Sequence, residues 1–269
     1  MCELFAMCSR VPTSVGFSLQ RLARRGGAEG PHRDGWGVAF YAERDALLLR
    51  EPGAASESGL ARYLEDHGPP SALVISHIRL ATFGETALRN TQPFMRELGG
   101  HTHVFAHNGD LPGWEHGAQP ASARFRPVGE SDSEAAFCHL LTRMAKLWDR
   151  QREGVPLLAE RLEAVAEFAA TLRAIGIANF LYSDSDTLFV HAHHRIPDGT
   201  LQQPGLYLLQ RSCEESVPDL ADSGIRLHTV QQALTLVASA PLTDEAWCAL
   251  EDGEVLAIQR GSVALRSPG

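Results

Sequence analysis

The order of the expected secondary-structure elements constrains the fold of this chain most strongly. Strand-like runs come first, two helical segments follow in one block at about Ala135–Trp148 and Pro156–Ala174, and the chain from Ile177 onward is mostly strands. A βαβ fold would alternate strands with helices along the chain, and this order does not. It predicts an α+β fold in which two sheets pack together with helices outside them.

Apolar runs bounded by turn residues predict the strands. Gly35–Tyr41 and Ala46–Arg50 have the spacing of a hairpin, and the continuous apolar run Ala72–Arg79 is typical of a buried strand. His101–His107 is predicted to be a strand that stops at Asn108-Gly109, because Asn-Gly is a strong turn dipeptide. Later strands are expected at Ala178–Ser183, Thr187–Ala192, Leu206–Gln210, Leu234–Ala238 and Glu254–Gln259.

Helices are predicted from apolar residues at helical spacing and from capping residues. The segments Leu19–Arg25 and Leu60–Asp66 are long enough for short helices. The longer segment Ala135–Trp148 is amphipathic. Ser131 and Glu134, just before it, match a capping box, in which each side chain bonds the backbone N–H of the other residue.

The composition narrows the classes of function. The chain has 269 residues without a linker, internal repeat or low-complexity tract, so we expect one domain spanning residues 1–269. Its formal charge is −9 and it has no basic patch, which disfavours nucleic acid and anionic membranes as partners. It shows no apolar run of about 18 residues and no signal-peptide pattern. A cytoplasmic location is therefore expected.

The five cysteines indicate neither a disulfide framework nor a zinc site, because their number is odd and they show no CxxC spacing. A reducing compartment fits them and would keep a nucleophilic thiol reduced. The five cysteines are Cys2, Cys8, Cys138, Cys213 and Cys248. All of them except Cys2 are expected to pack as small hydrophobic residues.

Cys2 stands directly after the initiator methionine and opens an apolar, strand-like run. Methionine is commonly trimmed before a small residue, and trimming would give Cys2 a free α-amino group beside its own thiol. The amine has an unperturbed pKa of about 8 and the thiol one of about 8.5, so the neutral amine can take the thiol proton near neutral pH. One residue would then hold both nucleophile and base. The alternative is a small, buried strand residue.

Six short motifs in one order carry a resemblance to a known family. The chain resembles the class II, or N-terminal nucleophile, glutamine amidotransferases, and more narrowly the stand-alone bacterial proteins of that type without a synthase domain. The motifs span about half the chain, and Ala240–Thr243 with Trp247 and Gly253 extends the likeness toward the end. They are Met1-Cys2-Glu3-Leu4, His32-x-Asp34-Gly35-Trp36-Gly37, His77-Ile78-Arg79-x-Ala81-Thr82-x-Gly84, Asn90-Thr91-Gln92-Pro93-Phe94, His107-Asn108-Gly109 and Asp132-Ser133-Glu134.

The resemblance implies both a fold and a reaction. The fold is a four-layer α/β/β/α N-terminal nucleophile hydrolase sandwich with two antiparallel sheets. The reaction is amide hydrolysis through a γ-glutamyl thioester on Cys2, with the α-amine of that residue as the base. The Asn108 side chain and the Gly109 backbone N–H would form the oxyanion hole. For an isolated Asn-Gly pair, the alternative is a hairpin turn.

The same resemblance assigns the two charged ends of a glutamine-like substrate. Arg79 matches the residue that binds the carboxylate, for which a bidentate guanidinium is suited. Asp132 matches the residue that binds the ammonium group. The alternatives are a surface ion pair for Arg79 and a helix cap for Asp132. His77 and Thr82 flank Arg79 and are grouped with the substrate-binding residues, with His77 supporting the loop rather than acting as a base.

The remaining polar motifs predict neither a metal nor a cofactor. His101-x-His103, His107 and His191-x-His193-His194 bring histidines together, but no acidic or cysteine ligand stands at tight spacing nearby. These histidines are expected to be polar strand residues. The glycines form neither a GxGxxG motif nor a P-loop.

Three functions remain open at this point. The first is a free-standing hydrolase of glutamine or a γ-glutamyl amide, and the second is a glutaminase subunit that passes ammonia to a separate synthase. The third is a catalytically silent γ-glutamyl-binding protein. The leaving amine is unspecified, and loops at about Ala81–Phe94 and Pro112–Pro127 are expected to line its side of the site. Homo-oligomer formation is also left open.

Overall fold

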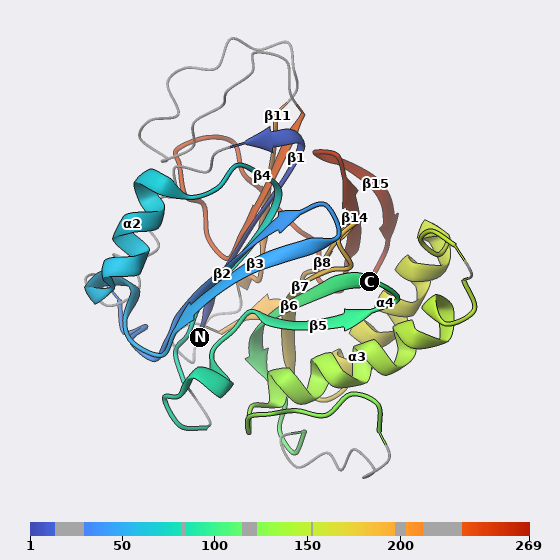
Figure 1. Cartoon of the computed structure of the whole chain (residues 1–269), viewed down its shortest axis with the longest axis horizontal. Coiled ribbons are helices and arrows are strands. Elements are labelled where there is room, and N and C mark those ends of the chain that lie inside the picture. Colours follow the sequence, from blue (N-terminus) through green and yellow to red (C-terminus); the bar gives the residue numbers. More distant parts are fainter. Residues whose placement is uncertain (14–29, 82–83, 115–122, 152, 197–202, 212–232) are drawn as a thin grey trace.

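The computed structural model of the chain describes residues 1–13, 30–81, 84–114, 123–151, 153–196, 203–211 and 233–269. The helix expected at Leu19–Arg25 lies outside these ranges. Two large sheets, in which every strand pair is antiparallel, lie face to face in the middle of the molecule (Figure 1).

The first sheet has seven strands and contains the start of the chain. Its order is β13 (Cys248–Ala249), β11 (Tyr207–Arg211), β12 (Leu234–Ala238), β1 (Glu3–Thr13), β4 (Ser71–Ile78), β2 (Trp36–Ala42) and β3 (Asp45–Glu51). The second sheet has six strands, in the order β15 (Ser262–Ser267), β14 (Val255–Gln259), β8 (Leu188–His191), β7 (Ile177–Ser183), β6 (His101–Asp110) and β5 (Phe94–Leu98). A short ladder pairs β9 (His194–Arg195) with β10 (Gln203–Pro204).

Alternation of side chains along the strands divides the core into layers. On β1, Leu4, Ala6 and Cys8 belong to the cluster between the two sheets, whereas Phe5 and Met7 belong to the cluster on the outer face of the seven-stranded sheet. Successive strand residues point to opposite faces, so one apolar strand supplies both clusters. This is why the N-terminal run is apolar throughout.

Helices cover the outer faces of both sheets. Helix α2 (Gly59–His67) packs Ala61 and Leu64 on the seven-stranded sheet. Helices α3 (Asp132–Trp148) and α4 (Leu158–Arg173) cover the six-stranded sheet (Figure 1). In the core beneath them, the rings of Phe105 and Phe137 stack with centroids 5.4 Å apart. Among the described residues, two short 3-10 turns also occur, at Ala55–Glu57 and Leu88–Asn90. The predicted four-layer α/β/β/α sandwich is confirmed.

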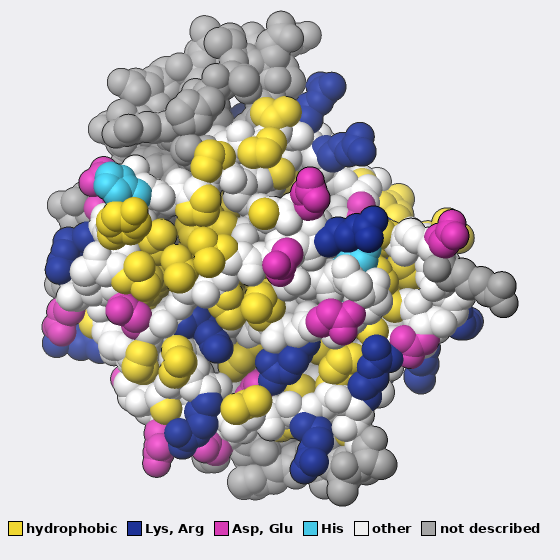
Figure 2. All heavy atoms as spheres, viewed as in Figure 1, with side chains coloured by type: hydrophobic (Ala, Val, Ile, Leu, Met, Phe, Trp, Pro, Cys, Tyr) yellow, Lys and Arg dark blue, Asp and Glu magenta, His cyan; other side chains and the backbone are white. Residues whose placement is uncertain are grey.

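Hydrophobic side chains gather over β3 and α2 on the face shown in Figure 2. Leu47 on β3 and Tyr63 on α2 are 50% and 57% exposed.

In the described part of the chain, no helix is long and apolar enough to cross a membrane.

The strand prediction fails at both ends of the segment Phe94–Asp110 in the six-stranded sheet. Strand β6 does not stop before Asn108-Gly109 but continues to Asp110, and these two residues pair with Asn179 and Ala178 of β7. The predicted turn is therefore wrong, because a neighbouring strand overrides the local preference of the dipeptide. Strand β5 begins at Phe94, inside the segment expected to be a loop.

The start of α3 matches only half of the predicted capping box. The Ser131 side chain accepts a hydrogen bond from the Glu134 N–H at 3.2 Å. The Glu134 carboxylate does not return it but accepts from the N–H groups of Val128 and Gly129 at 3.0 and 2.7 Å, and pairs with Arg96. The buried glutamate therefore fixes the loop that leads into the helix.

The cysteines outside the N-terminus differ in their surroundings. Cys8 and Cys138 are buried, as expected of small hydrophobic residues. Cys248 is exposed, so the expectation of packing is wrong there, because β13 lies at the edge of its sheet. Cys213 lies outside the described residues.

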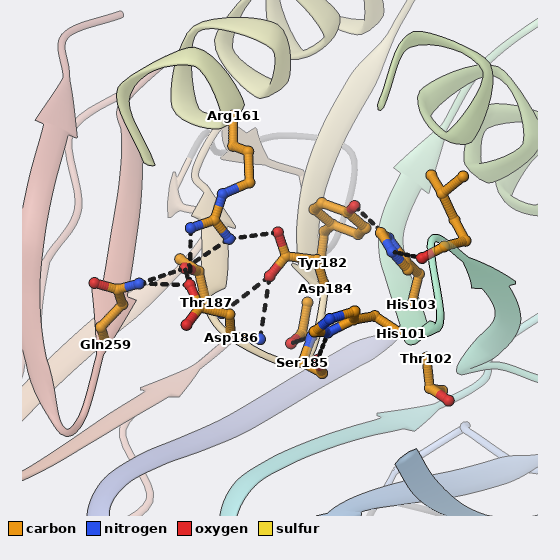
Figure 3. A network of polar contacts seen from close by, with 12 residues as sticks. His101, Thr102, His103, Arg161, Tyr182, Asp184, Ser185, Asp186, Thr187 and Gln259 are labelled. Carbon is orange, nitrogen blue, oxygen red and sulfur yellow. Dashed lines mark hydrogen bonds and ion pairs between the residues drawn. The ribbon is translucent and has the colours of Figure 1, made fainter. Parts of the chain in front are cut away.

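A buried charge network fastens α4 to the turn between β7 and β8 (Figure 3). Arg161 of α4 donates to Asp184 at 2.7 Å and to Asp186 at 2.8 Å, and its side chain is 3% exposed. Thr187 also accepts from Arg161, and Gln259 of β14 donates to Asp186. The network lies at the end of the six-stranded sheet where β6 begins, whereas Asn108 lies toward its other end.

Candidate active site

The backbone register brings Cys2 beside the end of β4. Glu3 of β1 pairs with Ile78, so the residue before Glu3 meets the residues that follow Ile78. The Cys2 sulfur lies 3.4 Å from both the N and the O of Leu80. Burial raises the pKa of the Cys2 thiol, and the nearby Asp132 adds to that rise, whereas the Leu80 backbone, the chain amine and Arg79 oppose it. The thiol is thus close enough to both Arg79 and Asp132 to feel their charges.

Arg79 is buried at 4% exposure and its guanidinium is held by backbone carbonyls. One terminal nitrogen donates to the carbonyls of Asp34 and Glu85 at 3.3 and 3.1 Å, and the other donates to Gly84 at 3.3 Å. Its own backbone N–H donates to Gly35 at 2.8 Å. The alternative of a surface ion pair is therefore wrong for this side chain.

Asn108 lies where the two sheets meet. Its side-chain nitrogen is 3.5 Å from the hydroxyl of Ser239, which in turn accepts the backbone N–H of Leu4 at 2.9 Å. The side-chain oxygen of Asn108 is buried and has no hydrogen-bond partner among the described residues. Asn108 therefore approaches the N-terminal strand from the opposite sheet.

Position 109 requires glycine because the backbone of Ile177 lies very close to it. A Cβ atom at this position would lie 1.7 Å from the carbonyl oxygen of Ile177, a distance that no side chain can tolerate. The side chain of Gln92 binds the neighbouring residue His107 on the other side of β6, accepting from its N–H at 2.7 Å and donating to its carbonyl at 3.2 Å. Because the N–H groups of alternate strand residues point the same way, the N–H of Gly109 points toward the side on which Gln92 lies.

Asp132 is the first residue of α3, and Ser131 is its cap. The Asp132 carboxylate accepts from the N–H of Ser133 at 2.6 Å and from the N–H of Leu111 at 2.9 Å. No lysine or arginine in the described part of the chain forms an ion pair with it. Neutral donors and the positive end of the helix therefore stabilise the anion without neutralising it.

His77 is fully buried on β4, opposite Leu4 and Gly37 of the neighbouring strands. Burial, followed by the nearby His107 and Arg79, lowers its pKa to about 3, so the ring is neutral at physiological pH. Neither ring nitrogen has a hydrogen-bond partner among the described residues. Thr82, the other predicted neighbour of Arg79, lies outside those residues.

Sequence reasoning missed a buried ion pair directly behind the nucleophile. Arg195 of β9 donates to the Glu3 carboxylate at 3.2 Å and to the Ser239 carbonyl at 2.8 Å. Asn179 of β7 is a second omission, because its side chain donates to the Asn108 carbonyl at 3.3 Å. An asparagine inside the apolar run Ala178–Ser183 was the signal that could have revealed it.

One group of side chains has ligand atoms close enough for a metal ion. The ligand atoms of His193, His194 and Asp252 lie within 4.8 Å of one another. However, the Ala178 N–H donates to Nδ1 of His193 at 3.2 Å, so the ring hydrogen is on Nε2, the nitrogen that faces Asp252 at 3.7 Å. That tautomer leaves Nε2 no lone pair for a metal, and the arrangement fits a histidine–aspartate pair better.

Each of the other histidines considered as ligands has at least one ring nitrogen in contact with a protein group. Their ring nitrogens contact the Ser185 hydroxyl (His101), the Tyr182 hydroxyl and Leu98 carbonyl (His103), the Ser133 hydroxyl and Ile177 carbonyl (His107), and the Glu254 carbonyl (His191). Such contacts are those of polar residues inside a sheet.

The chain is similar to several known proteins. The family described as glutamine amidotransferases class-II matches residues 1–268. The Escherichia coli K12 protein YafJ is 35% identical over 260 residues, which cover 94% of this chain and 96% of that protein. A solved Pseudomonas aeruginosa PA01 structure, described as a predicted glutamine amidotransferase, is 34% identical with a TM-score of 0.71 and covers 98% of this chain and 100% of its own.

A more distant structure shows the same fold. The glutamine phosphoribosylpyrophosphate amidotransferase of Bacillus subtilis is 17% identical with a TM-score of 0.58, and the match covers 96% of this chain and 47% of that one. The four-layer sandwich is thus the N-terminal nucleophile hydrolase fold.

Proposed function

Because the chain belongs to the class II glutamine amidotransferases, we propose that it hydrolyses glutamine or a γ-glutamyl amide through a thioester on Cys2. One observation supports this most strongly. The Cys2 sulfur lies 3.4 Å from the backbone of Leu80, next to the buried Arg79, and both Arg79 and Asp132, which begins a helix in a different layer, act on the pKa of the thiol. A substrate with a carboxylate and an ammonium group can bridge those two charges while its amide faces the sulfur.

The chemical steps follow from the atoms around Cys2. Removal of Met1 exposes the α-amine, which takes the thiol proton, and the thiolate attacks the amide carbon. The negative oxygen of the tetrahedral intermediate accepts hydrogen bonds from the Asn108 side-chain nitrogen and the Gly109 N–H. The ammonium then gives its proton to the leaving nitrogen as the C–N bond breaks. Water hydrolyses the thioester in the same way, which releases glutamate and restores the thiol.

The placement of the two substrate-binding charges is consistent with this scheme. Carbonyl oxygens orient the Arg79 guanidinium and neutral N–H groups orient the Asp132 carboxylate. These neutral partners fix the direction of each group. His77 fits a supporting role because its low pKa keeps it neutral, and Thr82 keeps its proposed place among the substrate-binding residues.

Turnover by the processed chain tests the proposal. The chain, prepared with Cys2 as its first residue and checked by intact mass, is incubated with glutamine and with a panel of γ-glutamyl amides. Glutamate release is expected, and the Cys2→Ala variant is expected to lose it and to lose labelling by an electrophilic glutamine analogue. Unchanged labelling of Cys2→Ala would refute the assignment of the nucleophile.

The same assay separates the alternatives. No turnover of any amide by the processed chain would favour a silent γ-glutamyl-binding protein. Copurification with a synthase, together with glutamine as the sole substrate, would favour a glutaminase subunit. Cys8→Ala is the matched control, because Cys8 lies on β1, the strand that follows Cys2, in the core between the sheets.

A further inference from the structure

His32 contacts the backbone of Met1 next to Cys2, the proposed nucleophile. The Met1 carbonyl accepts a hydrogen bond from Nε2 of His32 at 2.5 Å. Two covalent bonds separate that oxygen from the backbone nitrogen of Cys2. The sulfur of Met1 lies 3.2 Å from the N–H of Ile196, so both ends of this residue are held. When Met1 is removed, the nitrogen that becomes the α-amine of Cys2 remains beside the imidazole.

The loop that carries His32 is built on the same segment that holds the sulfur. The backbone N–H of Asp34 donates to the Arg79 carbonyl at 3.3 Å, and its carboxylate accepts the N–H of Ala81 at 2.8 Å. Leu80, between these two residues, contacts the Cys2 sulfur through its N and its O. His32 itself is only 8% exposed. The imidazole and the thiol are therefore positioned by one short stretch of backbone.

We infer that His32 is a positioning residue for the catalytic base: its ring accepts one N–H of the exposed α-amine and so turns the amine lone pair toward the sulfur of Cys2. This inference rests on the proposed function. With Met1 present the hydrogen must be on Nε2, because a carbonyl only accepts. With the amine present, the neutral ring carries its hydrogen on Nδ1 and accepts through Nε2, an exchange that imidazole makes readily.

The surrounding charges explain why a neutral acceptor is suited to this place. The thiol already feels Arg79 and Asp132, which act in opposite directions on its pKa. Behind it, the Glu3 carboxylate is paired with Arg195. An acidic partner would hold the amine as ammonium throughout, whereas a neutral imidazole orients it in both protonation states. Accepting from the ammonium also favours the ammonium–thiolate form, because hydrogen bonds to charged groups are the stronger ones.

The test uses chains released from an N-terminal fusion by a protease, so that Cys2 is first in every variant whatever the cell would trim. His32→Ala removes the acceptor, and His32→Gln keeps one in its amide oxygen. His67→Gln changes an exposed histidine on α2 and is the matched control. Three quantities are measured: kcat, KM, and the pH dependence of Cys2 alkylation by iodoacetamide.

We expect kcat of His32→Ala to fall roughly tenfold or more, with KM little changed because the substrate ends are held elsewhere. The midpoint of Cys2 alkylation should rise by about one pH unit, which is the same tenfold factor. His32→Gln should recover part of both losses, and His67→Gln should match the unaltered chain. A folded His32→Ala chain with unaltered kcat and alkylation midpoint would overturn the inference, and so would an equal loss in His32→Gln.

Failure of the inference and failure of the proposed function give different results. If no γ-glutamyl amide is hydrolysed by any variant, the proposed function fails, yet the alkylation profile still reports whether His32 acts on the thiol and amine. If the unaltered chain is active and His32→Ala alkylates like it, only the inference fails.

Discussion

Two buried arginines of this fold are held in opposite ways. Arg161 contacts the carboxylates of Asp184 and Asp186, and the resulting network ties α4 to the turn between β7 and β8 (Figure 3). Arg79 donates to the backbone carbonyls of Asp34, Gly84 and Glu85. Carboxylates cancel the charge of a guanidinium, whereas carbonyls only orient it. We propose that the first arrangement serves stability and that the second orients a guanidinium toward a ligand.

The aspartates show the same contrast. Asp184 is fully buried and faces Arg161; burial raises its pKa and the arginine opposes that rise. Asp132 accepts from two backbone N–H groups at the start of α3. At one end of the fold the arginine and aspartate meet, and near Cys2 they lie on different layers. Under the proposed function, a zwitterionic substrate supplies the bridge between them.

The largest effect on stability is expected at the ion pair of Arg161 with Asp184. Arg161→Met keeps the length of the side chain and leaves Asp184 buried without its cation, so the free energy of unfolding should fall by about 3–5 kcal/mol. Urea denaturation measures this change. Because the network lies away from Cys2, kcat/KM of the folded fraction should stay within about twofold of the unaltered value.

A second variant controls this prediction. In the double variant Arg161→Met with Asp184→Asn, the remaining charge is removed, and part of the lost stability should return. If Arg161→Met lowered the free energy of unfolding by less than about 1 kcal/mol, the pair would contribute no more than a surface ion pair. The contrast between a stabilising Arg161 and a ligand-binding Arg79 would then fail.

The same substitution at the other arginine should have the reverse outcome. Arg79→Met is expected to lower kcat/KM for a γ-glutamyl amide by roughly 100- to 1,000-fold, because a bidentate pair with a carboxylate supplies two hydrogen bonds to charge. The free energy of unfolding should change by about 1 kcal/mol, since the guanidinium's carbonyl partners can rebind water. Steady-state kinetics and urea denaturation measure the two quantities.

The neighbouring arginine provides the control. Arg89 pairs with Glu85 and Glu130 at the surface, so Arg89→Met should leave both kcat/KM and stability nearly unchanged. If Arg79→Met instead lowered the free energy of unfolding as much as Arg161→Met and left kcat/KM of the folded fraction unchanged, the two arginines would play the same role.

Much of the fold could be predicted because burial imposes a period on the sequence. Strand β12 was predicted with its bounds at Leu234 and Ala238, and β1 was predicted from an apolar run that packs on both faces. Edge strands escaped prediction. Strand β15 (Ser262–Ser267) is mostly exposed, and β5 carries Arg96 and Glu97 in its middle, so neither shows an apolar period.

The site could be predicted only where motifs mark it. Cys2, Arg79, Asn108 and Asp132 stand in recognisable motifs, but their surroundings depend on long-range contacts. The pairing of Glu3 with Arg195 joins residues 192 positions apart, which no local pattern reveals. The turn predicted at Asn108-Gly109 was wrong for a related reason. Pairing with β7, rather than the turn preference of the dipeptide, sets its conformation.

Two histidines extend the comparison to acidic pH. His77 lies near Arg79 and His103 near the Arg161 network, and burial lowers the pKa of each to about 3. Between pH 6.5 and 3 the unfolded chain then binds more protons than the folded one at these positions. The free energy of unfolding therefore falls as pH falls through this window, by about 2 kcal/mol per histidine at pH 5.

Replacing either histidine with glutamine removes that proton binding from the unfolded chain. We expect His77→Gln and His103→Gln each to reduce the loss of stability between pH 7 and pH 5 by about 2 kcal/mol, measured by urea denaturation at both pH values. Activity should separate them: kcat falls in His77→Gln, beside the proposed site, and stays unaltered in His103→Gln. An unchanged pH dependence in either variant, with His67→Gln as reference, would show that its ring is protonated in the folded chain. That result at His77 would place a second cation beside Arg79 and remove the contrast between the two ends of the molecule.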